Sequence, residues 1–350
     1  MSDLARRVVR WQARHGRHDL PWQRTRDPYR IWLSEVMLQQ TQVATVIPYY
    51  RRFLARFPSV KALARATLDE VLTLWSGLGY YSRARNLHAA ARAVAAAHGG
   101  RFPRARAEIE SLPGLGRSTA AAIAVFAFGE REAILDGNVK RVLARHFAVR
   151  GFPGDKRVEK RLWALAESEL PSRHLEAYTQ GLMDLGAGVC ARKRPACAKC
   201  PLNETCRAYA LGKPEAYPQP RPRKKRPEKK TSMLLLLRGG EVLLEKRPPA
   251  GVWGGLWCFP EVEPGSENLA GRKRLPALRH EFTHFTLDIT PVLGVLASAS
   301  PVAAEPGQVW LPVEDAIGAA VPAPVRKLLA WLRSGRLLGE PAALEKALQD

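Results

Sequence analysis

The sequence predicts two domains of different class, an α-helical domain followed by an α+β domain. The chain has 350 residues and 46% of them are hydrophobic, which is enough to fill two cores of common size. From about Ser34 to Leu211 the apolar residues follow a helical period interrupted by Gly and Pro turns, whereas strand-like runs prevail later. We therefore expect a helical domain at 1–212, a linker at 213–230 and an α+β domain at 231–350.

Local patterns place individual elements within these domains. The clearest helical segments are Asn86–Ala97 and Ser118–Phe128. The predicted linker combines five prolines with eight Lys and Arg residues, which indicates an extended, solvated segment. In the last domain we expect strands at 232–237, 241–245, 285–293 and 308–312, and helices near Ala316 and at 325–333.

The charge balance indicates a polyanionic partner. There are 55 Lys and Arg residues against 33 Asp and Glu, a formal net charge of +22, and such an excess repels itself unless nucleic acid neutralises it. We find no basic amphipathic helix, lipidation motif or apolar run of membrane-spanning length, so we expect no membrane partner. The first twenty residues lack the apolar stretch of a signal peptide, which favours the cytoplasm.

Four of the five cysteines lie close together, at Cys190, Cys197, Cys200 and Cys206. In a reducing compartment such a cluster indicates metal ligation rather than disulfides. Thiolate chemistry alone allows either zinc or an iron–sulfur cluster. Basic residues surround these cysteines, so their loop could face a phosphate backbone, although an ordinary solvated surface around a structural metal also fits.

The segment from Leu112 to Arg117 joins two predicted helices through Gly114 and Gly116. Glycines let the backbone approach a ligand closely, and the N–H groups at the start of the next helix can hold a phosphate oxygen. We interpret the segment as a helix-hairpin-helix clamp on the DNA backbone. A nucleotide-binding loop is disfavoured because no strand precedes it and no Gly-Lys-Ser/Thr follows, but a simple turn between helices remains an alternative.

Glu35 lies on a predicted helix that begins at Asp27 and Pro28, an N-cap followed by proline at the first helical position. Helical spacing places it beside Ile31, Trp32 and Leu38. An apolar face desolvates a carboxyl group and raises its pKa, so Glu35 could donate a proton near neutral pH. The alternative is a solvated surface glutamate.

Asp136 ends an apolar run and precedes a new helix, so it could be only a helix cap. Together with Glu35, however, it supplies what cleavage of an N-glycosidic bond needs. One carboxyl group protonates the departing base, and the other faces the oxocarbenium-like sugar as an anion.

A second tight turn runs from Gly77 to Tyr81 and is followed by Arg83 and Arg85. Bulky side chains that enter the base stack, together with cations that bind phosphates, are how proteins kink DNA and expose a base. The alternative is that both tyrosines of the turn belong to the core.

These segments together resemble the MutY family of adenine DNA glycosylases, within the helix-hairpin-helix superfamily that includes endonuclease III. The motifs extend along nearly the whole chain, from Leu33–Val43 through the two turns and Asp136–Val142 to the cysteines. The resemblance implies a DNA-repair enzyme that removes adenine opposite 8-oxoguanine or guanine in double-stranded DNA and leaves an abasic site. It also implies that Glu35 protonates adenine at N7, Asp136 stabilises the sugar cation and Asn138 orients the site.

The resemblance assigns further residues. Gln40, Thr41, Leu78 and Tyr80 would contact or wedge beside 8-oxoguanine, and Trp22, Val43 and Asp184 would line or support the adenine pocket. The same family carries a 4Fe-4S cluster, which assigns that cofactor to the four clustered cysteines as an iron-sulfur module at 190–206. Ser118 stands where endonuclease III-like enzymes have a catalytic lysine, so no Schiff base can form there and water completes the reaction.

The last domain resembles a Nudix fold without the acidic hydrolase box. In the family this domain reads 8-oxoguanine, and Thr283 and His284 lie in the matching segment. We expect a monomer that associates with the bacterial nucleoid through DNA. Two rivals are a strand-cutting glycosylase for oxidised pyrimidines, opposed by Ser118 and the extra domain, and a non-enzymatic DNA-binding or redox-sensing protein, opposed by the paired carboxyl groups.

Overall fold

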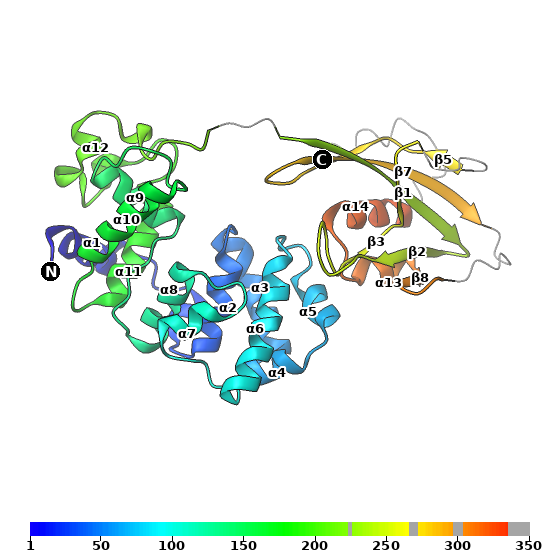
Figure 1. Cartoon of the computed structure of the whole chain (residues 1–350), viewed down its shortest axis with the longest axis horizontal. Helices are drawn as coiled ribbons and strands as arrows, with labels where there is room; N and C mark the ends of the chain where they lie inside the picture. Colours follow the sequence, from blue (N-terminus) through cyan, green and yellow to red (C-terminus); the bar gives the residue numbers. More distant parts are fainter. Residues whose placement is uncertain (223–225, 266–271, 297–303, 335–350) are drawn as a thin grey trace. The chain divides into compact units, whose positions relative to one another are not determined.

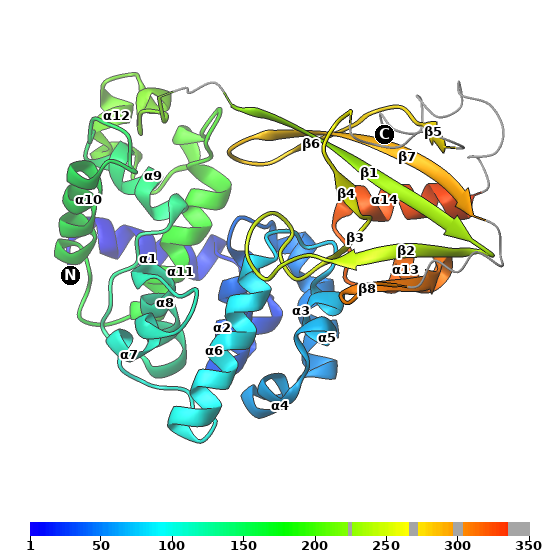
Figure 2. The ribbon, with the colours of Figure 1, turned by 45° about the vertical axis from the view of Figure 1, so that its right-hand side comes forward.

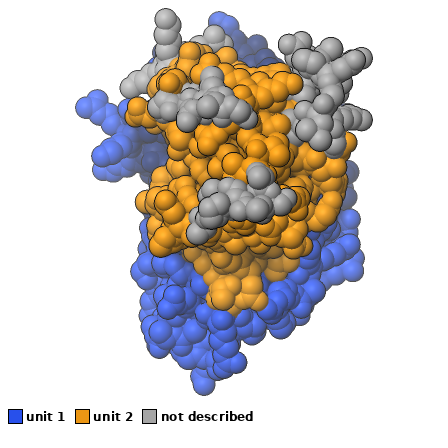
Figure 3. All heavy atoms as spheres, turned by 90° about the vertical axis from the view of Figure 1, so that its right-hand side faces the viewer, with its two compact units in different colours: residues 1–65, 86–223 blue, residues 66–85, 224–350 orange. Residues whose placement is uncertain are grey.

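The computed structural model describes residues 1–222, 226–265, 272–296 and 304–334. Residues 223–225 of the predicted linker and residues 335–350 of the predicted last domain lie outside the described residues. The chain divides into two units, residues 1–65 with 86–223 and residues 66–85 with 224–350 (Figures 1 and 3). Residues 66–85, which the sequence places in the helical domain, thus pack with the C-terminal part of the chain.

The first unit is helical (Figure 1). Its α-helices are α1 (Asp3–His15), α2 (Pro28–Leu38), α3 (Val43–Arg56), α4 (Val60–Arg65), α6 (Ser82–His98, which begins in the second unit), α7 (Arg106–Ser111), α8 (Arg117–Phe128), α9 (Gly137–His146), α10 (Lys156–Ser168), α11 (Leu175–Asp184) and α12 (Arg207–Ala210). Short 3-10 turns are η1 (Pro21–Arg24), η3 (Cys197–Lys199), η4 (Asn203–Thr205) and η5 (Pro214–Ala216), and η2 (Leu185–Val189) is a π-helix.

The core of this unit forms where α1, α8, α9, α10 and α11 bury their apolar faces against one another. Helix α1 packs on α11, and α2 packs on α8. Trp32 and Met37 of α2 are fully buried, so the helix that carries Glu35 is fixed in rotation by its own apolar side chains. The expected start of α2 is confirmed, because the Asp27 carboxylate accepts a hydrogen bond from the Tyr29 N–H at 2.9 Å.

The predicted hairpin joins α7 and α8. Gly114 has φ = 77°, and a Cβ at this position would lie 2.6 Å from the Cβ of Asn86 on α6, so both the left-handed conformation and the close packing require glycine. Gly116 precedes α8, and a Cβ there would meet no atom within 4 Å. The protein itself therefore gives no steric reason for glycine at 116.

Among the described residues, the second unit contains helix α5 (Leu68–Trp75), a mixed sheet and two later helices. The sheet strands among the described residues are β1 (Glu228–Arg238), β2 (Glu241–Lys246), β3 (Trp257–Cys258), β4 (Glu261–Val262), β5 (Arg272–Arg274), β6 (Leu278–Glu281), β7 (Thr286–Leu296) and β8 (Gln308–Pro312). Helices α13 (Val313–Gly318) and α14 (Ala323–Arg333) follow β8 (Figure 2). The predicted α+β class and the four predicted strands are thus observed, as β1, β2, β7 and β8.

The sheet is organised around β1 and β7, which pair in parallel along their whole length from Glu228–Thr286 to Arg238–Leu296. Strand β2 returns antiparallel to β1 through Gly239 and Gly240, both with positive φ, and β8 pairs with β2. Strand β1 begins at Glu228, inside the segment predicted as linker. No helix of the described residues has the length and apolar character to cross a bilayer.

Candidate active site

Glu35 projects from α2 into a hollow of the first unit. Its side chain lines two adjoining cavities, which share Arg17, Trp22 and Gln180 in their walls. Burial raises the pKa of Glu35 to about 8, and repulsion from the Asp136 carboxylate adds to this shift. Glu35 is therefore protonated at neutral pH, and the prediction of a desolvated carboxyl group is supported over that of a solvated surface residue.

Asp136 caps α9 and also lines one of these cavities. Its carboxylate accepts hydrogen bonds from the Val139 N–H at 2.8 Å and from the side-chain amide of Asn138 at 3.3 Å. Burial raises the pKa of Asp136 above its ordinary value, while these N–H donors and Arg141 oppose the rise. Capping and a position beside Glu35 are thus combined in one side chain.

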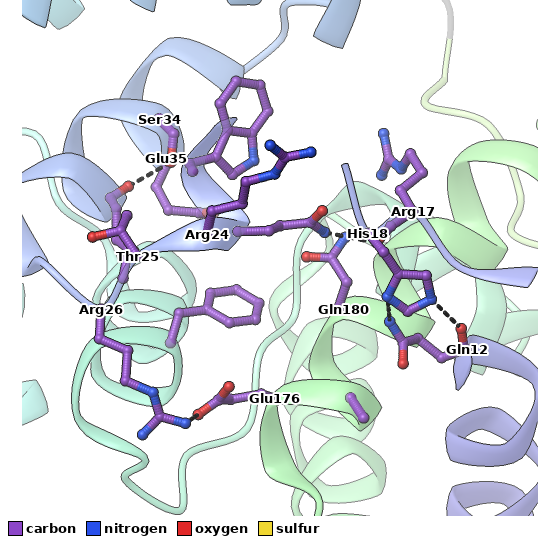
Figure 4. A pocket seen from close by; sticks show the side chains of 15 residues that line it. Gln12, Arg17, His18, Arg24, Thr25, Arg26, Ser34, Glu35, Glu176 and Gln180 are labelled. Carbon is purple, nitrogen blue, oxygen red and sulfur yellow. Dashed lines mark hydrogen bonds and ion pairs between the residues drawn. The ribbon is translucent and has the colours of Figure 1, made fainter. Parts of the chain in front are cut away.

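We call the two hollows cavity A and cavity B. Cavity A has a volume of about 610 Å³ and is rich in polar side chains, including those of Arg17, His18, Arg24, Thr25, Arg26 and Glu176 (Figure 4). Cavity B has a volume of about 490 Å³, and its wall includes Asp136 and Asn138. Glu35 therefore stands at the junction of a cavity that contains Asp136 and one that does not.

Asp184 lies behind the walls of both cavities. It is 5% exposed and accepts hydrogen bonds from the backbone N–H of Arg17 at 2.9 Å, from the Arg17 Nε at 2.7 Å and from the Gln180 Nε2 at 2.8 Å. Arg17 and Gln180 are residues that the sequence analysis missed. Asp184 thus supports the pocket by holding two side chains that line it.

The other predicted pocket residues have different positions. Trp22 lines both cavities, and Thr41, Val43 and Ser118 line cavity B. Gln40 has φ = 58° and is exposed at the turn after α2. The Ser118 hydroxyl accepts a hydrogen bond from the Leu135 N–H at 2.9 Å, so it fixes the backbone directly before Asp136.

The four clustered cysteines line one small apolar cavity. Burial is the largest cause of a raised pKa at Cys197, Cys200 and Cys206, and it brings the pKa of Cys200 to about 12. Arg145, which is 2% exposed, donates hydrogen bonds to the Cys190 Sγ at 3.3 Å and to the Ala191 carbonyl at 2.7 Å. Among the described residues, no group of three or more His, Cys, Asp or Glu side chains has the arrangement of a single-ion site.

One guanidinium links the cysteine loop to the turn at Asp136. Arg141 donates to the Asn138 Oδ1 at 2.9 Å and to the carbonyl groups of Cys190 at 2.8 Å and Gly186 at 2.6 Å. Gly186 belongs to the π-helix η2, and a Cβ there would lie 2.5 Å from the Asn138 Cβ. The position of Asn138 therefore depends on the segment that leads to the first clustered cysteine.

A third hollow, cavity C, belongs to the second unit and has a volume of about 580 Å³. Tyr80, Thr283 and His284 all line it. The Phe282 N–H donates to the Phe285 carbonyl at 2.9 Å, which closes a tight turn with Thr283 and His284 exposed at its tip. Tyr80 is 46% exposed, whereas Leu78 of the same predicted wedge is 5% exposed.

Comparison with known proteins first defines the class. Residues 33–168 match the HhH-GPD superfamily of base excision DNA repair proteins, and residues 232–331 match the NUDIX domain. A thermostable thymine-DNA glycosylase of known structure is 33% identical, with a TM-score of 0.55 over 59% of this chain and 95% of that one. The helical unit is thus that of a DNA-repair glycosylase.

Full-length relatives then identify the family. The adenine DNA glycosylase of Buchnera aphidicola subsp. Acyrthosiphon pisum is 38% identical over 92% of this chain and 95% of its own length. That of Homo sapiens is 35% identical over 92% of this chain and 72% of its own. The chain belongs to the adenine DNA glycosylase family, whose members are enzymes of base excision repair.

Proposed function

We propose that this protein hydrolyses the N-glycosidic bond of adenine mispaired with 8-oxoguanine or guanine in double-stranded DNA, and leaves an abasic site in an intact strand. The observation that carries the proposal is the position of Glu35, a carboxyl group with a pKa of about 8 at the junction of cavities A and B. An extruded base can enter cavity A while its sugar remains beside Asp136 in cavity B. Family membership supports adenine as the base.

In this reaction the bond between C1′ and N9 breaks. Glu35 donates its proton to adenine at N7, so that the electron pair of the bond leaves with a neutral base. The Asp136 carboxylate faces the sugar as positive charge develops on it, and Asn138 orients that carboxylate. Water then adds to C1′, and the proton that it releases restores the acid form of Glu35.

The absence of a nucleophilic amine at position 118 favours a monofunctional enzyme. Ser118 lines cavity B and its hydroxyl is bound to the Leu135 N–H. Lys140, which is near Asp136 in sequence, forms an ion pair with Glu159 at 2.6 Å. Neither residue is arranged to form a Schiff base with the sugar.

We assign a 4Fe-4S cluster to Cys190, Cys197, Cys200 and Cys206, because four thiol donors line one apolar cavity and Arg145 stabilises negative charge on Cys190. The cluster would hold the basic loop 190–206 in shape at the DNA backbone. Purified protein should then contain about four iron and four sulfide per chain. Stoichiometric zinc in active protein that lacks iron would contradict the assignment.

We assign recognition of the partner base first to exposed groups of the second unit. Thr283 and His284 offer a hydroxyl and an imidazole at the tip of their turn, and Tyr80 faces the same cavity C. We further assign Gln40, Thr41 and Leu78 to contacts near 8-oxoguanine, and Gly114 and Gly116 to a phosphate. The protein would act as a monomer on the DNA of a bacterial cytoplasm.

The test is an excision assay on duplexes with A opposite 8-oxoguanine, G, C or T. We expect free adenine from the first two, and strand breaks only after treatment with alkali. Strand cleavage without alkali would contradict the monofunctional assignment. Release of an oxidised pyrimidine but no adenine would favour the rival glycosylase, and binding without release of any base would favour the non-enzymatic alternative.

A further inference from the structure

The turn from Gly77 to Tyr81 has a left-handed backbone at three residues, and hydrogen bonds from neighbouring residues hold part of it. Gly77 and Gly79 have φ of 96° and 73°, and Tyr80, which has a side chain, has φ = 49°. The Trp75 indole N–H donates to the Gly79 carbonyl at 3.0 Å, and Arg83 donates to the same carbonyl at 3.1 Å. A left-handed tyrosine persists only where surrounding contacts hold it, so the contacts on this turn define where Tyr80 points.

A second set of contacts comes from the C-terminal part of the same unit. The Val321 carbonyl, just before α14, accepts hydrogen bonds from the Ser76 hydroxyl and the Tyr81 hydroxyl, both at 3.2 Å. Ser76 and Tyr81 stand on either side of the residues 77–80. The Val321 carbonyl oxygen therefore holds the turn at both ends.

Arg326 of α14 completes this arrangement. One of its terminal nitrogens donates to the Ile317 carbonyl at 2.7 Å, and the other donates to the Ser76 hydroxyl. The Ser76 hydroxyl thus accepts from Arg326 and donates to the Val321 carbonyl, and its oxygen also lies 3.3 Å from the Tyr81 hydroxyl oxygen. A guanidinium can make both contacts at once, whereas an ammonium is a single point donor on a flexible stem.

We propose that Arg326 is a positioning residue that fixes the exposed orientation of Tyr80 through Ser76 and the Val321 carbonyl. The inference rests on the proposed function, because it makes the C-terminal domain contribute to lesion discrimination by two routes. One route is direct contact through Thr283 and His284. The other is the conformation of a turn that lies 240 residues or more away in sequence.

The experiment uses full-length protein and a duplex with 2-aminopurine beside 8-oxoguanine, so that unstacking raises its fluorescence. The fluorescence is read in a Glu35→Gln background, so that adenine is not excised during the measurement. The protein is at saturating concentration, so that differences between variants do not reflect differences in affinity for DNA. Single-turnover excision is measured separately in the Glu35 protein. Arg326→Met is compared with Tyr80→Ala, with Arg326→Lys, and with Arg333→Met, a control on the same helix that pairs with Glu314.

We expect Tyr80→Ala to abolish most of the fluorescence rise and Arg326→Met to reduce it, with Arg326→Lys in between. Arg326→Met should slow excision of A opposite 8-oxoguanine about fivefold to tenfold, which is the effect expected for the loss of one ordinary hydrogen bond. In the Tyr80→Ala background, Arg326→Met should cause no further loss of excision rate or of fluorescence. Ser76→Ala should reproduce the Arg326→Met effect, and the double variant should equal either single variant.

An unchanged fluorescence rise in Arg326→Met, or additive effects with Tyr80→Ala, would overturn the positioning role while leaving adenine excision intact. Thermal midpoints of all variants identify any that fail to fold. If Arg326→Met is one of these, Ser76→Ala tests the same contact in its place. If the protein with Glu35 releases no adenine from any duplex, the proposed function fails instead. The fluorescence comparison still decides the role of Arg326 in that case.

Discussion

Glu35 and Asp136 lie among desolvated groups in the first unit, whereas Thr283 and His284 stand exposed at the tip of a turn in the second. Burial changes the pKa of both carboxyl groups, and hydrogen bonds fix Asp136 from several sides. The turn instead gains rigidity from its aromatic base, where Phe282 stacks on Phe285 at 4.4 Å between ring centroids. Bond cleavage needs groups removed from water, while recognition can use polar groups that give up water only when DNA binds.

The largest effect is expected from Glu35→Gln. The amide keeps the size of the side chain but has no acidic proton for the departing base, so single-turnover excision should fall about 10³-fold. Binding to the mismatched duplex should remain, because the change removes no positive charge. Excision at a near-normal rate would show that the Glu35 carboxyl group is not the acid.

Asp136→Asn should lower excision about 10²-fold, because a neutral amide cannot balance the sugar cation. Asp155→Asn is a matched control, since Asp155 also caps a helix through its carboxylate and lies outside the site. Equal and small losses in the two variants, measured as excision rates alongside thermal midpoints, would reduce Asp136 to a cap.

The pH profile tests the effect of burial directly. With a pKa of about 8, Glu35 holds its proton below that pH and loses it above. The excision rate should therefore fall about tenfold for each unit above 8, and it should fall again in acid as the Asp136 carboxylate becomes protonated. A rate measured in the DNA-bound state that starts to fall near pH 4.5, the ordinary value for a glutamate, would mean that Glu35 is solvated.

Gly186→Ala should slow excision about tenfold, because its Cβ would lie 2.5 Å from that of Asn138 and displace the side chain beside Asp136. Gly188→Ala, in the same π-helix, is the control, since a Cβ there meets no atom within 4 Å. Single-turnover rates of the two variants should differ clearly. Similar rates would mean that the backbone around residue 186 adjusts without displacing the Asn138 side chain.

The smallest effect belongs to the exposed turn. Thr283→Ala should lower the ratio of excision rates on A opposite 8-oxoguanine and A opposite G about threefold to tenfold, and Thr283→Ser should restore it. Point substitution is a cleaner test than removal of the domain, because Leu72 of α5 packs near Gly255. Equal losses on both duplexes would assign the turn to general affinity.

Local patterns predicted the residues whose roles depend on their own element. The period of α2 placed Glu35 on an apolar face, and the position of Asp136 before α9 marked it as a cap. Arg17 escaped prediction because its partner Asp184 is 167 residues away. The strands β3 to β6 are too short to show a residue pattern. The apolar face of α5 is visible in the sequence, but the sequence does not indicate which part of the chain packs on it.

Ser118 lines cavity B and also holds the backbone before Asp136, so a substitution at this position changes both features. A lysine at this position would bring an amine into cavity B, as a strand-cutting glycosylase needs, but it would also delete the hydroxyl that holds the Leu135 N–H. The backbone that delivers Asp136 would lose an anchor in the same step. A Ser118→Lys change alone should therefore loosen the turn before Asp136, and a second change near Leu135 would be needed to hold this backbone in place again.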